Sequence, residues 1–288
     1  MKSAPVPAAS ALTVADTRRA LAELDAAAPR FNQRLLAHFR VVRAVFLRDI
    51  RTRVAGSRFG FLLSLGQPLS HIGIMLSIYY ILGRTGPMGT DTTMFLATGA
   101  LPFVVWLYGF RQVKTGPVSN RRLLSFPGVT LVDLLVARSI GELLSSACVV
   151  IFTLAALALL GFDVVVFNVP QFVFVMFQAY LLGVSIGVFF AILALLSPFF
   201  LIIANLFVPL SWITCGVMYL PSSLPEQLSY WIWFLPLTQI VDAARTAYYG
   251  YYISDFYNGY YIAGLMLAFV TVAVIMMHAL RTKISEAL

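Results

Sequence analysis

The chain has 288 residues, of which 60% are hydrophobic and only 11% are charged. A soluble domain uses about 25% charged residues, so this composition excludes a soluble enzyme or binding module. The net charge of +8 does not indicate nucleic acid, because 18 of the 20 Lys and Arg residues fall in residues 1–58, 111–138 and 281–288, around long uncharged segments. Such clusters mark the cytoplasmic side of a membrane protein.

The N-terminal part of the chain is polar and then amphipathic. Residues 1–30 are rich in Ala and Pro and lack the apolar core of a signal peptide, so we expect a disordered cytoplasmic tail. Residues 33–58 place Leu35, Phe39 and Phe46 on one helical face among seven arginines. This pattern predicts a helix lying in the membrane interface, with Arg51, Arg53, Ser57 and Arg58 at its C-terminal end.

Uncharged windows then predict six membrane-spanning helices with both termini in the cytoplasm. A run of 62 residues from Val164 to Pro225 carries no charge and is long enough for two spans of about 20 residues each, with a turn at Ser197-Pro198. The basic segment 111–138 then lies inside, and Asp91 and Asp163 lie outside. The predicted spans are residues 61–83, 93–113, 138–161, 171–196, 199–220 and 258–280.

Residues 221–250 do not fit a simple span. Their apolar part, Leu228–Ile240, is too short to cross a bilayer, and Tyr230, Trp231 and Trp233 are typical of the headgroup level. We therefore expect a re-entrant or interfacial helical hairpin at the outer surface. The fold class predicted is an all-α integral membrane protein.

Several chemical motifs are absent or better explained by packing. A phosphate-binding loop needs Gly before its Lys, and neither Lys2, Lys114 nor Lys283 follows Gly, so ATP is not bound through such a loop. Gly183-Val-Ser-Ile-Gly187 matches a serine-hydrolase elbow by letter, but it lies mid-span, where small residues four apart favour close helix packing. The scattered His and Cys residues lack metal-ligand spacing, so no metal site or catalytic centre is predicted.

Three ordered blocks resemble the ABC-2 permeases of bacterial polysaccharide exporters, most of all the capsular polysaccharide export permeases. The first is Arg51–Gly60 with Gln67-Pro-Leu69, and the second runs from Phe95 to Phe103 and on through Asn120–Pro127. The third is Leu224-Pro-Glu226, Pro236-Leu237 and Ile240–Arg245. Together they cover most of residues 45–250.

The resemblance implies a type V exporter-like transmembrane domain over residues 31–288, acting as a homodimer with two copies of a separate ABC ATPase that holds ATP and Mg²⁺. It implies export of a lipid-linked, acidic capsular polysaccharide across the bacterial inner membrane, with periplasmic co-polymerase and outer-membrane partners. It also implies an ATPase-coupling helix at Asn120, Arg121, Arg122, Leu123, Leu124, Ser125, Phe126 and Pro127.

Aromatic and basic residues near the span ends are the candidates for the cargo path. Aromatic rings can stack on sugar faces, and cations attract an acidic glycan. These candidates are Tyr79, Tyr80, Arg84, Trp106, Tyr108, Arg111, Lys114, Trp212, Tyr219 and Arg245.

Other readings of the same residues stay open. An ABC-2 exporter of O-antigen, teichoic acid, a lipid or a drug would share the pattern. An ATPase-independent carrier would need charges buried in mid-span, and the sequence predicts none there. A membrane enzyme would need a catalytic constellation, which the motifs do not supply.

Overall fold

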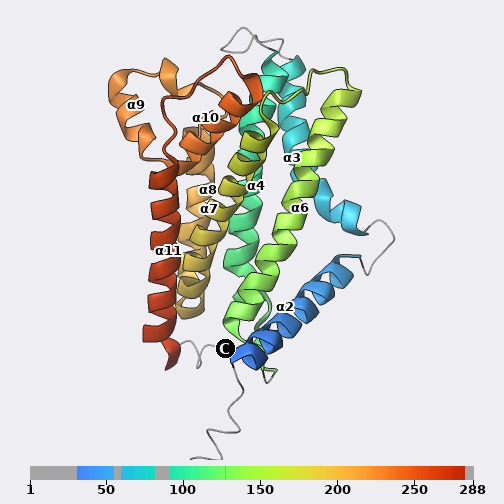
Figure 1. The fold of residues 1–288 in the computed structure, drawn as a ribbon, viewed down its shortest axis with the longest axis vertical. Helices are drawn as coiled ribbons and strands as arrows, with labels where there is room; N and C mark the ends of the chain where they lie inside the picture. The colour runs from blue at the N-terminus through green and yellow to red at the C-terminus, as the bar shows by residue number, and fades with distance from the viewer. Residues whose placement is uncertain (1–30, 55–59, 82–90, 127, 283–288) are drawn as a thin grey trace, which may run out of the picture. The chain divides into compact units, whose positions relative to one another are not determined.

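A computed structural model describes residues 31–54, 60–81, 91–126 and 128–282, and every regular element in these ranges is a helix (Figure 1). The all-helical fold predicted from the sequence is confirmed. The chain divides into two compact units, Met1–Val41 and Val42–Leu288, and the second holds the helical bundle. The helices are α2 (Phe31–Val54), α3 (Gly60–Ile81), α4 (Thr92–Ser119), α5 (Arg121–Leu124), α6 (Leu131–Leu159), α7 (Val169–Leu196), α8 (Phe199–Thr214), the 3₁₀ turn η1 (Pro221–Ser223), α9 (Glu226–Trp233), α10 (Pro236–Tyr249) and α11 (Gly259–Ala279).

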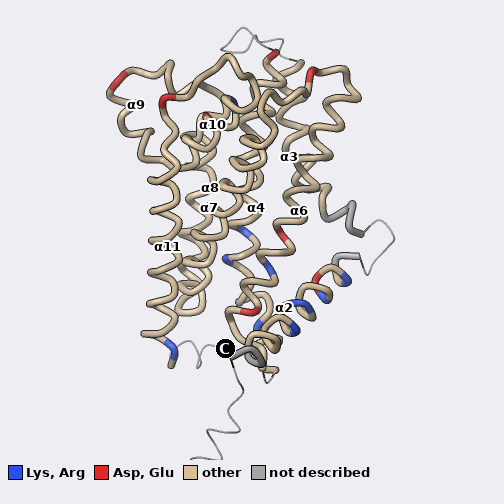
Figure 2. The backbone as a smooth tube through the Cα atoms, viewed as in Figure 1, with Lys and Arg blue, Asp and Glu red and all other residues tan. Residues whose placement is uncertain are grey.

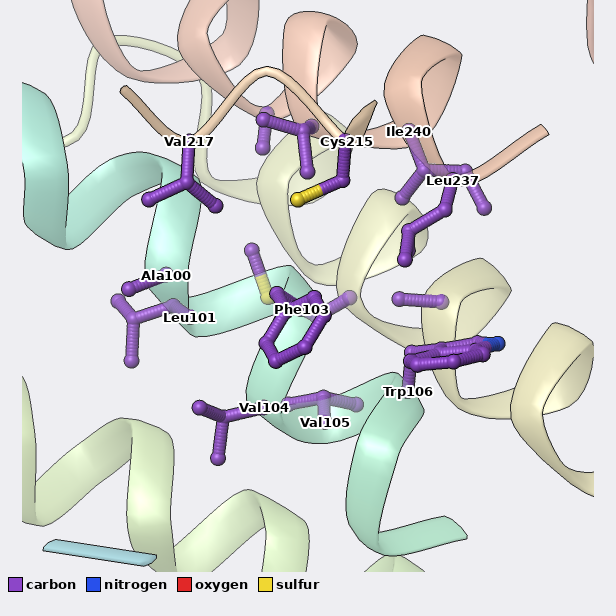
Figure 3. Close-up of a cluster of buried hydrophobic side chains, with 14 of the residues drawn as sticks. Ala100, Leu101, Phe103, Val104, Val105, Trp106, Cys215, Val217, Leu237 and Ile240 are labelled. Atoms are coloured by element: carbon purple, nitrogen blue, oxygen red, sulfur yellow. The ribbon is translucent and has the colours of Figure 1, made fainter. Parts of the chain in front are cut away.

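The bundle is built around α4. This helix packs against α3, α6, α7, α8 and α10, and nearly all of its side chains from Thr93 to Phe110 are buried. By contrast, α8 and α11 expose most of their apolar side chains, as expected for helices that face lipid. Figure 3 shows the core on α4: Phe103 lies below side chains of α10 and of the turn after α8, and Leu101 and Val104 point away from α10.

Glycines let α4 and α7 approach each other closely. A Cβ at Gly183 would overlap the carbonyl oxygen of Trp106, and one at Gly187 would lie 3.0 Å from Val113 Cβ. The Ser185 hydroxyl donates to the Leu182 carbonyl at 2.9 Å inside the same helix. The packing interpretation of Gly183-Val-Ser-Ile-Gly187 is therefore confirmed.

Local sequence signals fix several helix starts. Asp91 accepts a hydrogen bond from the Thr93 N–H at 2.7 Å at the start of α4. Thr130 and Asp133 form a reciprocal capping box at the start of α6, and Asn168 caps α7. These side chains satisfy N–H groups that the first helical turn leaves without partners.

Four helices in the described part of the chain are long and apolar enough to cross a membrane: α4, α6, α7 and α11. The shorter α8 is also apolar. Lys and Arg gather toward the end of the bundle where α4 finishes and α6 begins, whereas Asp and Glu predominate at the end that carries α9 and α10 (Figure 2). The protein is therefore a multi-pass membrane protein.

α4 and α6 are longer than the uncharged sequence windows that predicted them, and α8 is shorter than its window. α4 continues to Ser119 and α6 starts at Leu131, so Lys114 and Glu142 lie within helices and are only 2% exposed. Lys114 lies just beyond the end of the predicted span 93–113 and Glu142 near the start of the predicted span 138–161, so the expectation that no charge is buried in mid-span stays a prediction. α8 stops at Thr214, and the backbone then turns at Gly216, whose φ is +77°.

Candidate functional site

A lateral cavity of about 400 Å³ opens between α3, α4 and α8. Its two polar side chains are contributed by His71 of α3 and Arg111 of α4, and its largest aromatic wall is Trp212 of α8. The remaining lining residues are Phe103, Leu107, Val208, Pro209 and Ile213. The cavity thus combines an apolar wall with a cation, a combination suited to an amphiphilic or anionic cargo.

A row of aromatic rings in contact with one another extends from this cavity along α4. The Phe103 ring meets Trp212 edge-on at 4.6 Å and lies 5.6 Å from Trp106. Trp106 in turn stacks on Phe110, with centroids 5.4 Å apart. Offset and edge-on pairs of this kind hold rings in fixed orientations, so the cavity wall is rigid on its α4 side.

The row of rings ends at the buried ammonium group of Lys114. Lys114 Nζ lies 4.3 Å from the Phe110 ring centroid and donates to Asn205 Oδ1 of α8 at 2.8 Å. A buried charge is tolerated only when such partners replace its hydration. This contact ties α4 to α8 below the cavity.

The structure brings some of the predicted path residues together and separates others. Arg111 and Trp212 line the cavity, while Trp106 and Lys114 are buried behind it. Tyr80 lines a separate apolar cavity of about 680 Å³ between α3 and α6, and Tyr79 contacts Met218 Sδ at 3.3 Å. Arg84 lies outside the described residues.

Tyr108 faces a different, smaller cavity of about 50 Å³ between α3, α4 and α6. Glu142, Ser145, Ser146 and Gln112 share this cavity. Arg138, four residues before Glu142 on α6, places its Nε 3.2 Å from Asp49 Oδ2 of α2. The cavity is large enough for a water molecule and too small for a sugar ring.

Arg245 of α10 and Tyr219 of the turn after α8 are committed to contacts within the protein. Arg245 is fully buried, donates to the carbonyls of Val217 (2.8 Å) and Tyr219 (3.1 Å), and stacks over Phe95 at 3.9 Å. The Tyr219 hydroxyl donates to the Thr214 carbonyl at 2.6 Å. In this conformation Arg245 is closed off from any cargo and fastens the turn after α8 to α4 and α10.

Burial shifts the pKa values of two charged side chains on α10, Arg245 and Asp242. Desolvation lowers the pKa of Arg245 to about 10, which leaves the guanidinium charged at neutral pH. Desolvation also raises the pKa of Asp242, although hydrogen bonds from Ser254 and Tyr252 to its carboxylate oppose that shift. Asp242 therefore holds the loop after α10, and Arg245 holds the turn after α8.

The predicted coupling segment forms a corner between α4 and α6. Asn120 is buried and ends α4, whereas Arg121, Arg122, Ser125 and Phe126 are exposed around the four-residue helix α5. Leu123 and Leu124 are half-buried, and Pro127 lies outside the described residues. Arg51 on α2 is exposed, nothing is described of the Arg53 side chain, and Ser57 and Arg58 lie outside the described residues.

Sequence reasoning missed Phe103, Pro209 and Asn205, which complete the cavity and the contact beneath it. Phe103 follows Pro102 in an apolar run and resembles any core residue. Asn205 is the one polar side chain between Phe199 and Leu210. A lone amide in a span is a detectable signal, because it needs a polar partner there.

This fold and this cavity define a multi-pass helical membrane protein with a cavity between α3, α4 and α8. The chain belongs to the ABC-2 type transporter family, whose sequence profile matches residues 40–249. It is therefore the membrane component of a transporter.

Curated relatives cover most of the chain. It is 30% identical to the polysialic acid transport protein KpsM of Escherichia coli, over 77% of this chain and 86% of that protein. It is 25% identical to the capsule polysaccharide export inner-membrane protein CtrC of Neisseria meningitidis, over 85% and 93% respectively. Identity to the corresponding protein BexB of Haemophilus influenzae is 22%, over 76% and 83%.

Proposed function

We propose that this chain is the membrane-spanning subunit of an ATP-driven exporter that moves a lipid-linked, acidic capsular polysaccharide across the bacterial inner membrane. The observation that carries the proposal is the match to relatives named for polysialic acid transport and capsule polysaccharide export, over three quarters of the chain or more. The cavity adds a chemical reason, because it places Arg111 beside the Trp212 and Phe103 rings.

The topology proposed has six spans with both termini in the cytoplasm. We propose α3 and α8 as the two spans beside α4, α6, α7 and α11: α3 has 22 residues without a charge, about 33 Å of helix. α8 has 16 residues, about 24 Å of helix, and we propose that the turn from Cys215 to Leu220 completes this crossing. The basic corner around α5 then faces the cytoplasm, and α9 and α10 form the outer hairpin.

ATP and Mg²⁺ are proposed to bind a separate ABC ATPase, two copies of which act on a homodimer of this chain. The chain has no phosphate-binding loop of its own. The exposed face of α5, with Arg121, Arg122 and Phe126, is the surface proposed to receive the ATPase. The amphipathic α2 is proposed to lie at the cytoplasmic membrane interface beside it.

Movement of the polymer follows from the position of the cavity. ATP-driven closure of the ATPases displaces the α5 corners, and α3 and α8 part at the dimer axis to widen the chamber. The cation at Arg111 attracts the acidic glycan, while the rings offer stacking surfaces that tolerate different sugars. Hydrolysis resets the helices, so the polymer advances in steps.

Reconstitution tests this function directly. The chain is purified together with its partner ABC ATPase and placed in liposomes, and ATP-dependent entry of lipid-linked capsular polysaccharide is measured. We expect entry only with both subunits, ATP and Mg²⁺. Transport by the chain alone would identify an ATPase-independent carrier, and selective transport of O-antigen, teichoic acid, a lipid or a drug would identify another cargo.

A further inference from the structure

A line of charged contacts joins α2 to the corner between α4 and α5. The buried Asp49 carboxylate lies between two arginines: Oδ1 is 3.0 Å from Arg48 Nη2, and Oδ2 is 3.2 Å from Arg138 Nε of α6. The same Arg48 Nη2 donates to Asn120 Oδ1 at 2.8 Å. Three segments that are distant in sequence therefore meet in one partly buried network.

Asn120 connects the C-terminal end of α4 to the charged contacts of α2. Its Nδ2 donates to the Gly116 carbonyl at 2.9 Å, and its backbone N–H donates to the same oxygen, which ends α4. Its Oδ1 is then left to accept from Arg48. One side chain thus caps α4 and holds α2, immediately before α5 begins.

Burial makes this network stiffer than a surface ion pair. Asp49 is 8% exposed and Asn120 is 9% exposed, and the Arg138 side chain that pairs with Asp49 is 16% exposed, so water and salt screen this pair weakly, whereas the 41% exposed Arg48 side chain is screened more. Apolar packing reinforces the polar contacts, because Phe46 and Ile50 of α2 pack beside Gly141 and Leu144 of α6. A displacement of the corner must therefore carry residues 45–50 with it.

α2 can pass such a displacement to the cavity. Only residues 55–59 separate the end of α2 from the start of α3, a length that spans at most about 18 Å. α3 in turn contributes His71 to the cavity wall. The network is thus connected along the chain to one side of the chamber.

We propose that Arg48, Asp49 and Asn120 are positioning residues that lock α2 to the α4–α5 corner as a single lever. Displacement of the corner reaches α3 through α2, and opening of the chamber depends on this lock. The inference rests on the proposed function in one respect: an ABC ATPase supplies the displacement.

The first test measures export per ATP hydrolysed in the complex of chain and ATPase. Arg48→Ala and Asn120→Ala are expected to lower export at least fivefold while ATPase activity stays within twofold, and the double variant should be no worse than either single one. Arg43→Ala, on the exposed side of the same helix, is the matched control and should export normally.

Asn120→Asp separates the two roles of this side chain. It keeps an acceptor for Arg48 and removes the Nδ2 donor to Gly116, so export per ATP should be close to wild type. Unchanged export per ATP in Arg48→Ala would overturn the proposal. So would an Asn120→Asp variant as defective as Asn120→Ala, because the cap on α4 would then be the role that matters.

Cross-linking tests whether the two parts move together. In a Cys148→Ala/Cys215→Ala background, cysteines at positions 48 and 120 are joined by a short bismaleimide. Because this pair of substitutions removes the Arg48–Asn120 contact, we expect export to be at least fivefold below that of the cysteine-free protein before cross-linking and to recover when the cross-link restores the connection. A variant that stays equally defective after cross-linking would show that α2 and the corner do not move as one body. A wild-type complex that binds no ATPase and exports nothing would refute the proposed function instead, before any variant is compared.

Discussion

At the scale of single residues, the packing of α10 and the turn after α8 against α4 depends on one buried charge. Arg245 fits between Phe95, Val217 and Tyr219 only because residue 99 of α4 has no side chain: a Cβ there would lie 2.8 Å from Arg245 Nη2 and 3.0 Å from Val217 Cα. The buried position of Arg245 therefore depends on glycine at residue 99.

We predict that Gly99→Ala destabilises the protein by about 1–3 kcal/mol, as overpacking does in a close-packed site. Thermal unfolding of the purified protein in detergent measures the change. Gly73→Ala on α3 is the matched control, because a Cβ there meets no atom within 4 Å and alanine favours helix. Equal melting temperatures for both variants would contradict the packing described for Arg245.

The cavity residues should matter for cargo and not for folding. Arg111→Gln and Trp212→Leu are each predicted to raise the cargo concentration for half-maximal export about tenfold, which corresponds to about 1.4 kcal/mol. Melting temperature and assembly with the ATPase should stay unchanged. Phe174→Leu, an exposed side chain on α7, is the control for loss of an aromatic ring. Export with wild-type affinity in both cavity variants would remove this cavity from the path.

At the scale of elements, the contact between α4 and α8 rests on a buried cation and its acceptor. Asn205→Leu is predicted to destabilise the fold by roughly 1–3 kcal/mol, because it leaves the Lys114 ammonium without the Asn205 oxygen. Lys114→Met should cost less, and the double variant should resemble Lys114→Met alone. Thermal unfolding of the three variants checks this, and strictly additive losses would show that the two side chains act independently.

Helix lengths show what a charge pattern can and cannot locate. Arg111 and Lys114 end the second uncharged window, yet backbone hydrogen bonding continues to Ser119. Charged side chains near span ends are accommodated by partners such as Asn205, so the window marks an apolar core and not the helix itself. α8 shows the opposite case, because its apolar run continues past the turn at Gly216.

At the scale of the whole molecule, the distribution of charge predicts orientation. In whole cells a membrane-impermeant maleimide should label Gln227→Cys on α9, and it should label Ser125→Cys beside α5 only after permeabilisation. Both positions are exposed. Labelling of position 125 from outside would reverse the proposed topology, and with it the ATPase-binding surface.

The sequence alone determined the class of protein, the approximate helices and the family resemblance, because apolar length, basic clusters and motif order are properties of the linear chain. It did not determine which candidate residues meet. Arg111 and Trp212 share a cavity while Tyr80, Tyr108 and Arg245 lie elsewhere. Only the packing of α4 against its neighbours decided that, because in an apolar helix nearly every face looks alike until a partner helix covers one of them. For the same reason, only the tertiary structure showed that Arg48, beside Asp49, contacts Asn120, which lies 72 residues further along the chain.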